Sequence, residues 1–101
     1  MDKKYKIEYL PIAEEELSNI IHYIMLDNPD AALSMADKLD QSISILELYP
    51  NSGTIPNDIR LQVLNYRMLV VESYLVFYVV LKDTVEIRRT LHGKRKYNFL
   101  L

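Results

Sequence analysis

The hydrophobic pattern of the chain changes its period once, across a loop between Pro50 and Asp58. Before the loop, apolar residues recur every three or four positions, as on one face of a helix, and after it β-branched and aromatic residues predominate. The loop itself is rich in residues that favour turns. A helical first half and a strand-rich second half indicate an α+β domain. A chain of 101 residues supports one hydrophobic core, so we expect a single domain over residues 1–101.

Two helices are predicted in the first half. A short strand over residues 5–10 precedes the first helix, which covers residues 11–26. Asn28 can then cap a second helix and Pro29 fits its first position. The second helix should end near Tyr49, because a proline follows that residue and disfavours helical geometry there. So short a break between the helices predicts an antiparallel helical hairpin.

Three strands are predicted after the loop, over residues 61–71, 74–81 and 85–91, close enough in sequence to form a meander. The predicted order is β-α-α-β-β-β, an antiparallel sheet of about four strands with the N-terminal helical hairpin packed on one face. The strand over residues 74–81 is apolar on both faces, as a central strand is. One hairpin covers one face, so we expect apolar residues on the other face to be exposed as a partner site, unless sheet twist and the C-terminal tail cover them.

Composition excludes several kinds of chemistry. The chain has no cysteine, which excludes disulfides, thiolate catalysis and Cys-based metal sites. Its two glycines are isolated and form no phosphate loop, and its two histidines have no metal-ligand spacing, so we expect neither metal nor cofactor. The longest apolar run is eight residues, far short of the roughly 20 that span a bilayer. No apolar run of signal-peptide length follows the N-terminus, and we expect a cytoplasmic protein with no membrane partner.

The net charge of −2 conceals an asymmetry along the chain. Residues 1–58 contain 11 acidic and 4 basic residues, whereas residues 59–101 contain 3 acidic and 8 basic residues. Five of those basic residues lie between Arg88 and Lys96, with no acidic residue among them. A cationic cluster on an acidic protein indicates an anionic partner, or else a solvated basic terminus.

His92 ends the last predicted strand, next to this cationic cluster. By the period of a strand it shares a face with Arg88 and Thr90, whereas Arg89 points to the other face. Arg67, in an earlier strand, is a further candidate cation. Cations can hold a phosphate while His or Tyr moves a proton, and RNA supplies its own 2′-hydroxyl nucleophile, so metal-independent RNA cleavage is compatible with these residues. Such clusters of arginine and histidine also bind nucleic acid or acidic proteins without catalysis.

Three segments carry a resemblance to a known family. They are Tyr66-Arg67-Met68-Leu69, Tyr74-Leu75-Val76-Phe77-Tyr78 and Leu91-His92-Gly93-Lys94-Arg95. With the order of elements, they resemble the RelE/ParE superfamily of bacterial toxins over nearly the whole chain. The resemblance implies the toxin half of a type II toxin–antitoxin module. It also implies a cognate antitoxin protein as partner, and oligomers only as the toxin–antitoxin complex.

The superfamily contains two activities, which the resemblance carries over only in part. RelE-like members cleave mRNA in the ribosomal decoding site, whereas ParE-like members inhibit DNA gyrase and lack the nuclease residues. Matched without gaps, Arg95 falls on the nuclease branch's C-terminal catalytic arginine and Lys94 on the lysine beside it. Leu75 stands where that branch has its other catalytic arginine. Leu101 stands at its tyrosine, with Tyr97 as a nearby substitute.

At this point we favour a metal-independent, ribosome-dependent endoribonuclease that cleaves mRNA. Its predicted catalytic residues are Arg67, His92, Arg95 and Tyr97. Its predicted nucleic-acid-binding residues are Arg88, Arg89, Lys94 and Lys96. The alternative is a ParE-like inhibitor of DNA gyrase that acts by binding, with Arg89, His92 and Arg95 as contacts or scaffold. A third hypothesis is a degenerate toxin that only binds its antitoxin.

Overall fold

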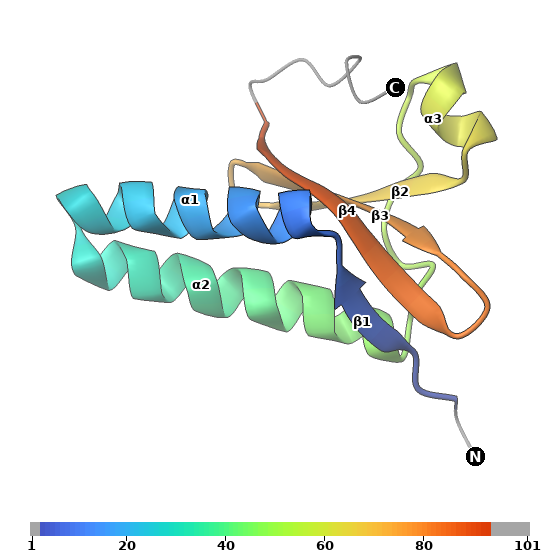
Figure 1. Ribbon diagram of the computed structural model, residues 1–101, viewed down its shortest axis with the longest axis horizontal. Coiled ribbons are helices and arrows are strands. Elements are labelled where there is room, and N and C mark those ends of the chain that lie inside the picture. Colours follow the sequence, from blue (N-terminus) through green and yellow to red (C-terminus); the bar gives the residue numbers. More distant parts are fainter. Residues whose placement is uncertain (1–2, 94–101) are drawn as a thin grey trace.

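The computed structural model describes residues 3–93. A helical hairpin packs on one face of a four-stranded sheet (Figure 1). The elements in chain order are β1 (Lys6–Tyr9), α1 (Pro11–Asp27), α2 (Pro29–Ser44), the 3-10 turn η1 (Ile45–Glu47), α3 (Ile59–Val63), β2 (Tyr66–Val71), β3 (Tyr74–Val80) and β4 (Thr84–His92). This arrangement confirms the predicted α+β fold class and adds two short helical segments to the predicted order.

The helical hairpin turns where the sequence predicts. The side-chain oxygen of Asn28 accepts a hydrogen bond from the backbone N–H of Ala31 at 3.1 Å and so caps α2. Pro29 occupies the first turn of α2, where a missing N–H is tolerated. The two helices run side by side, and their shared tip extends beyond the sheet (Figure 1).

The sheet has the strand order β1-β4-β3-β2. Strands β2, β3 and β4 form the predicted antiparallel meander. The prediction of an antiparallel sheet is wrong for one pair, because β1 runs parallel to β4, with Lys6 opposite Thr84 and Tyr9 opposite Ile87. A parallel neighbour requires a long connection, and here the helical hairpin and the meander lie between the two strands.

The helix α3 was not predicted, because residues 61–71 were interpreted as one strand. Asp58 caps α3: its Oδ1 accepts a hydrogen bond from the backbone N–H of Arg60 at 2.9 Å. The Arg60 side chain also donates to this carboxylate and lowers the pKa of Asp58. Asn65 then adopts a positive φ of 62°, which asparagine tolerates well, and turns the chain into β2.

Each face of the sheet carries its own apolar cluster. Between the sheet and the helical hairpin, the buried cluster is formed by Ala13, Leu39, Ile43, Leu46, Val71, Val76, Tyr78, Val85 and Ile87. The second cluster, on the face away from the hairpin, is formed by Leu61, Tyr66, Leu75, Phe77, Val79 and Leu91. The predicted exposure of this second face is wrong, since Phe77 is 0% exposed and packs in one cluster with Leu61 of α3. The tail that was named as an alternative cover lies outside the described residues.

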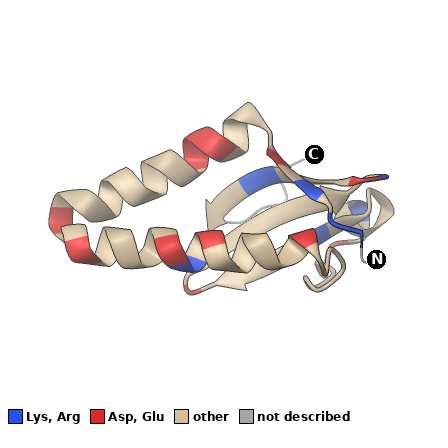
Figure 2. Cartoon of the chain, turned by 90° about the horizontal axis from the view of Figure 1, so that it is seen from below, with Lys and Arg blue, Asp and Glu red and all other residues tan. Residues whose placement is uncertain are grey.

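The charge asymmetry of the sequence becomes an asymmetry of layers. Acidic positions recur along the two helices of the hairpin, and basic positions lie on the strands of the sheet (Figure 2). Within residues 3–93, no helix is both long and apolar enough to cross a membrane.

Candidate functional site

A β-bulge in β4 shifts the alternation of its side chains between the two faces of the sheet by one residue. Tyr78 on β3 lies opposite Ile87, but the next residue back along β3, Phe77, lies opposite Arg89. Arg88 is therefore the extra residue of the bulge. The bulge makes one predicted grouping wrong, because Arg88 shares the face of Glu86 and not that of His92. A strict period of two does not hold across an inserted residue.

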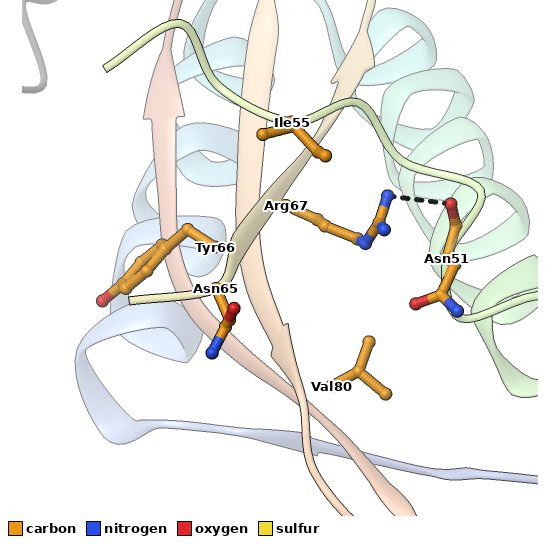
Figure 3. Close-up of a pocket in the computed structure, with 6 residues that line it drawn as sticks. All are labelled: Asn51, Ile55, Asn65, Tyr66, Arg67 and Val80. Carbon is orange, nitrogen blue, oxygen red and sulfur yellow. Dashed lines mark hydrogen bonds between the residues drawn. The ribbon is translucent and has the colours of Figure 1, made fainter. Parts of the chain in front are cut away.

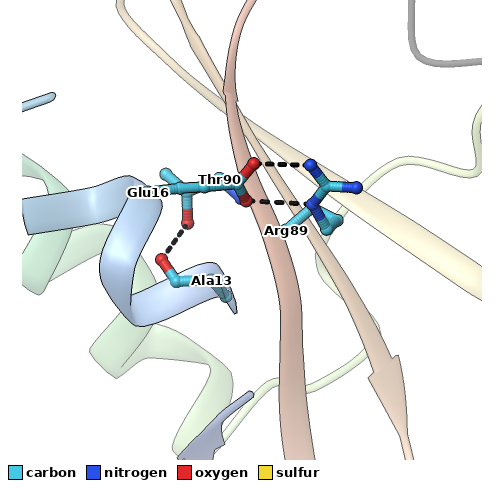
Figure 4. Close-up of polar contacts among 4 residues, drawn as sticks. All are labelled: Ala13, Glu16, Arg89 and Thr90. Carbon is cyan, nitrogen blue, oxygen red and sulfur yellow. Dashed lines mark hydrogen bonds and ion pairs between the residues drawn. The ribbon is translucent and has the colours of Figure 1, made fainter. Parts of the chain in front are cut away.

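Arg89 forms an ion pair with Glu16 that joins two distant parts of the chain. Its Nε donates to Glu16 Oε1 at 3.0 Å and its Nη2 to Glu16 Oε2 at 2.6 Å (Figure 4). Glu16 Oε1 also accepts the backbone N–H of Thr90 at 3.0 Å. Strand β1 ends opposite Ile87, so beyond that point the carboxylate from α1 takes the place of a neighbouring strand. Arg89 thus joins α1 to the edge of β4, a role that sequence reasoning did not find.

Arg88 is also engaged within the protein. Its Nε donates to Glu86 Oε1 at 2.8 Å, and its guanidinium lies over the ring of Tyr66 at 5.6 Å from the ring centre. Stacking on an aromatic ring together with an ion pair fixes the orientation of the guanidinium. A phosphate would have to compete with Glu86 for this cation.

His92 lies at the end of β4, opposite Tyr74 at the start of β3. The two rings meet edge to face, with their centres 5.3 Å apart. The backbone N–H of Gly93 donates to the carbonyl oxygen of Ser73 at 2.6 Å, which ties the end of β4 to the β2–β3 turn. The half-buried imidazole therefore sits where the chain leaves the sheet. The four remaining predicted site residues, Lys94, Arg95, Lys96 and Tyr97, lie outside the described residues.

Arg67 is not brought together with His92. It lies on β2 opposite Tyr78, whereas His92 lies on the other side of β3 opposite Tyr74. Four residues along β3 separate the two positions by roughly 13 Å along the strand, at about 3.3 Å per residue. Nη1 of Arg67 instead donates to the carbonyl oxygen of Asn51 at 3.1 Å (Figure 3). It also donates to the carbonyl oxygen of Gly53 at 3.1 Å.

Tyr78 holds the loop between the two halves of the chain. Its hydroxyl donates to the carbonyl oxygen of Pro50 at 2.7 Å and accepts the backbone N–H of Gly53 at 2.9 Å. The side chain is fully buried, and burial raises the pKa of the hydroxyl. The sequence offers one signal for this contact. A tyrosine in a central, otherwise apolar strand must find a hydrogen-bond partner for its buried hydroxyl, and the proline–glycine loop can supply one.

Stability should fall at alkaline pH, with Tyr78 as one cause. The unfolded chain loses its phenol proton near pH 10, while the pKa of folded Tyr78 is higher. The protonated hydroxyl of Tyr78 makes its full contribution to the free energy of unfolding below about pH 10, and this contribution is lost as the pH rises through the pKa of the folded protein. We expect the free energy of unfolding from urea titrations to decline more steeply above about pH 10 than in Tyr78→Phe. Burial also raises the pKa of Tyr9, so a smaller decline should remain in the variant. Equal declines of the free energy of unfolding with pH in the unchanged chain and in Tyr78→Phe would contradict the role of Tyr78.

Comparison with known proteins identifies the family. The family model described as "ParE toxin of type II toxin-antitoxin system, parDE" matches residues 7–97. The chain belongs to the ParE toxin family. The resemblance to the RelE/ParE superfamily is thereby confirmed, and membership implies an antitoxin protein as partner of this ParE toxin.

A solved structure supports the same fold. A chain from the "Chromosomal ParDE TA system from P. aeruginosa" superposes with a TM-score of 0.72 at 20% sequence identity, covering 90% of this ParE toxin and 98% of that chain. No curated protein sequence matches.

In this ParE toxin, Leu75, which the sequence resemblance matches to the nuclease branch's central-strand arginine, lies inside a hydrophobic cluster. Leu75 is 9% exposed and packs with Phe77 and Leu91 on the face away from the helices. Among residues 3–93, no group of three or more His, Asp or Glu side chains converges as a metal site. The arginines of residues 3–93 are thus bound to carboxylates or backbone carbonyls of the protein, and the imidazole of His92 lies at the end of β4.

Proposed function

We propose that this ParE toxin arrests growth by binding DNA gyrase and blocking it, and not by cleaving mRNA on the ribosome. The observation that carries the proposal is the closed apolar face around Leu75. A nuclease of this fold needs a phosphate-clamping arginine there, and its loss removes on the order of a few kcal/mol of transition-state stabilisation. A leucine that packs against Phe77 and lies in one cluster with Leu61 supports a structural role for this face.

The described arginines support the same proposal. Arg88 pairs with Glu86, and Arg89 pairs with Glu16. Arg67 lies on a different strand, β2, and donates to a carbonyl oxygen of the loop. None of them is placed to hold a phosphate beside His92. An inhibitor that acts by binding needs no aligned proton donor and cation, only a complementary surface. In this proposal, His92 and the basic segment that follows it form the gyrase contact.

The helical hairpin offers a separate surface that suits the antitoxin. A groove of about 340 Å³ lies at the hairpin, with an apolar lining and two carboxylates. It is lined by Tyr9, Leu17, Ile21, Ala36, Asp37, Leu39, Asp40 and Ile43. We place the antitoxin here, as an amphipathic helix with basic residues along its polar edge, because an apolar stripe and cations would match both features of the groove.

A supercoiling assay tests the proposed target. Purified toxin is added to gyrase, relaxed plasmid and ATP, and in parallel mRNA 5′ ends are mapped after a pulse of expression. We expect the toxin to inhibit supercoiling and to leave mRNA 5′ ends unchanged. In the double variant Lys94→Ala with Arg95→Ala, the concentration for half inhibition should rise about tenfold or more, as expected when contact residues are truncated.

Matched variants separate the three hypotheses. Lys82→Ala removes an exposed lysine from the opposite end of the sheet and should inhibit gyrase like the unchanged toxin. New mRNA cleavage inside codons that disappears in His92→Ala would instead establish the ribosome-dependent nuclease. If the toxin causes neither growth arrest nor gyrase inhibition, the result would indicate a degenerate toxin that only binds its antitoxin.

A further inference from the structure

Arg67 differs from the other arginines of residues 3–93 in what neutralises its charge. The arginines that bind a carboxylate are Arg60, Arg88 and Arg89. Arg67 donates only through Nη1, and only to the backbone carbonyls of Asn51 and Gly53. Within the described part of the chain no carboxylate pairs with it. Among residues 3–93, the half-buried guanidinium of Arg67 therefore has no ion-pair partner to compensate its charge.

The same guanidinium lines a pocket of about 210 Å³ (Figure 3). The pocket is lined by Asn51, Ile55, Asn65, Tyr66, Arg67 and Val80. No acidic side chain is among these residues. While Nη1 is held by the loop, the other two nitrogens of Arg67 face the side of Val80 (Figure 3). The pocket therefore combines one oriented cation, two side-chain amides and apolar walls.

We propose that this pocket binds a carboxylate on a short aliphatic arm, presented as a glutamate side chain by a partner protein. Nε and Nη2 of a guanidinium form a planar fork that matches the two oxygens of a carboxylate. Because the loop already holds Nη1, Arg67 loses less conformational freedom on binding. Ile55 and Val80 suit the methylene groups of the arm. A single cation favours one carboxylate over a nucleic-acid backbone, which recruits several cations.

Titration of the full chain, followed by ¹H–¹⁵N NMR, tests the pocket with a blocked glutamate residue, N-acetylglutamate N′-methylamide. We expect saturable shifts of the Arg67 Nε–H signal and of the Asn51 and Asn65 side-chain amides, with a Kd of about 1 mM. The matched blocked glutamine should bind about tenfold more weakly or worse, because it carries no charge. Equal responses to the two probes would overturn the proposal. So would equal shifts of the Arg60 and Arg88 Nε–H signals, which would indicate unspecific attraction to any arginine of the protein.

Two further probes distinguish the source and the chemistry of the ligand. Glutarate offers the same carboxylate without a peptide backbone, and inorganic phosphate offers a different anion. Weaker binding of both than of the blocked glutamate is the expected result. Tighter binding of glutarate would assign the pocket to a free acid and overturn the protein source, and tighter binding of phosphate would overturn the carboxylate.

A variant pair tests the pocket without disturbing Arg67, which also holds the loop. Val80→Glu supplies a carboxylate from the pocket wall, and Val80→Gln has the same shape without the charge. Val80→Glu should shift the Arg67 Nε–H signal without added ligand and lower the affinity for blocked glutamate about tenfold relative to Val80→Gln. Identical titrations of the two variants would overturn the site. This inference goes beyond the proposed function and does not depend on whether gyrase is the target.

Discussion

Glu16→Ala is expected to lower the free energy of unfolding by about 3 kcal/mol, because it removes the carboxylate that pairs with a largely buried cation. The Glu16 and Arg89 side chains are only 13% and 22% exposed, and two hydrogen bonds join them. The carboxylate is the first cause of the raised pKa of Arg89. Its loss also leaves the N–H of Thr90 without its acceptor at the edge of β4. Equilibrium unfolding in urea measures the difference.

The neighbouring Glu15 provides the control for this prediction. Glu15 is exposed on α1, and Glu15→Ala should change the free energy of unfolding by no more than about 0.5 kcal/mol. Glu16→Gln retains the shape but not the charge, and should fall between the two alanine variants. Arg89→Met combined with Glu16→Gln should cost less than the sum of the single substitutions, since each one breaks the same pair. Equal effects of Glu15→Ala and Glu16→Ala would contradict the role of Glu16 as the anchor of α1 on β4.

Gly53→Ala is expected to destabilise the fold by about 3 kcal/mol, because the added methyl group has no room. A Cβ at this position would lie 2.5 Å from the hydroxyl oxygen of Tyr78 and 2.9 Å from the carbonyl oxygen of Met68. Relief requires Tyr78 to move, and the hydrogen bonds from its hydroxyl to Pro50 and from Gly53 to its hydroxyl would then be lost. Thermal or urea unfolding measures the effect.

The double variant shows whether Tyr78 causes this destabilisation. In a Tyr78→Phe background the nearest contact is gone, although the ring carbon at 2.8 Å remains, so Gly53→Ala should cost about 1 kcal/mol less than in the unchanged chain. The exposed neighbour Ser52 serves as control, and Ser52→Ala should change stability by less than about 0.5 kcal/mol. Strict additivity of Gly53→Ala and Tyr78→Phe would refute the steric explanation.

Local signals predicted the helical hairpin and the meander well. Asn28 and Pro29 act only on the residues beside them, so the cap and the start of α2 can be predicted from sequence. The α3 helix was missed because its apolar residues also fit a strand and its start depends on one side chain, Asp58. The parallel pairing of β1 was missed because pairing between distant segments has no local signature.

The candidate site was harder to predict than the fold, because its chemistry depends on contacts across the chain. Arg89 is predicted to contact nucleic acid or a partner protein, and its pairing with Glu16, 73 residues earlier, has no signal in the local sequence. Arg67 was expected to work with His92, yet the two lie on opposite sides of β3. A count of basic residues does not show which of them the protein uses to hold itself together.

One inserted residue in β4 decides which side of the sheet presents each of the residues from Arg89 to His92. Before Arg88 the odd-numbered residues of β4 face the helices, as Val85 and Ile87 do, and after it Thr90 and His92 face them. A relative without the insertion would present its counterpart of His92 from the opposite side, although the two sequences match well around it. Gain or loss of a single residue here is therefore a route by which a toxin of this fold can exchange one face of the sheet for the other while keeping every other side chain of the strand.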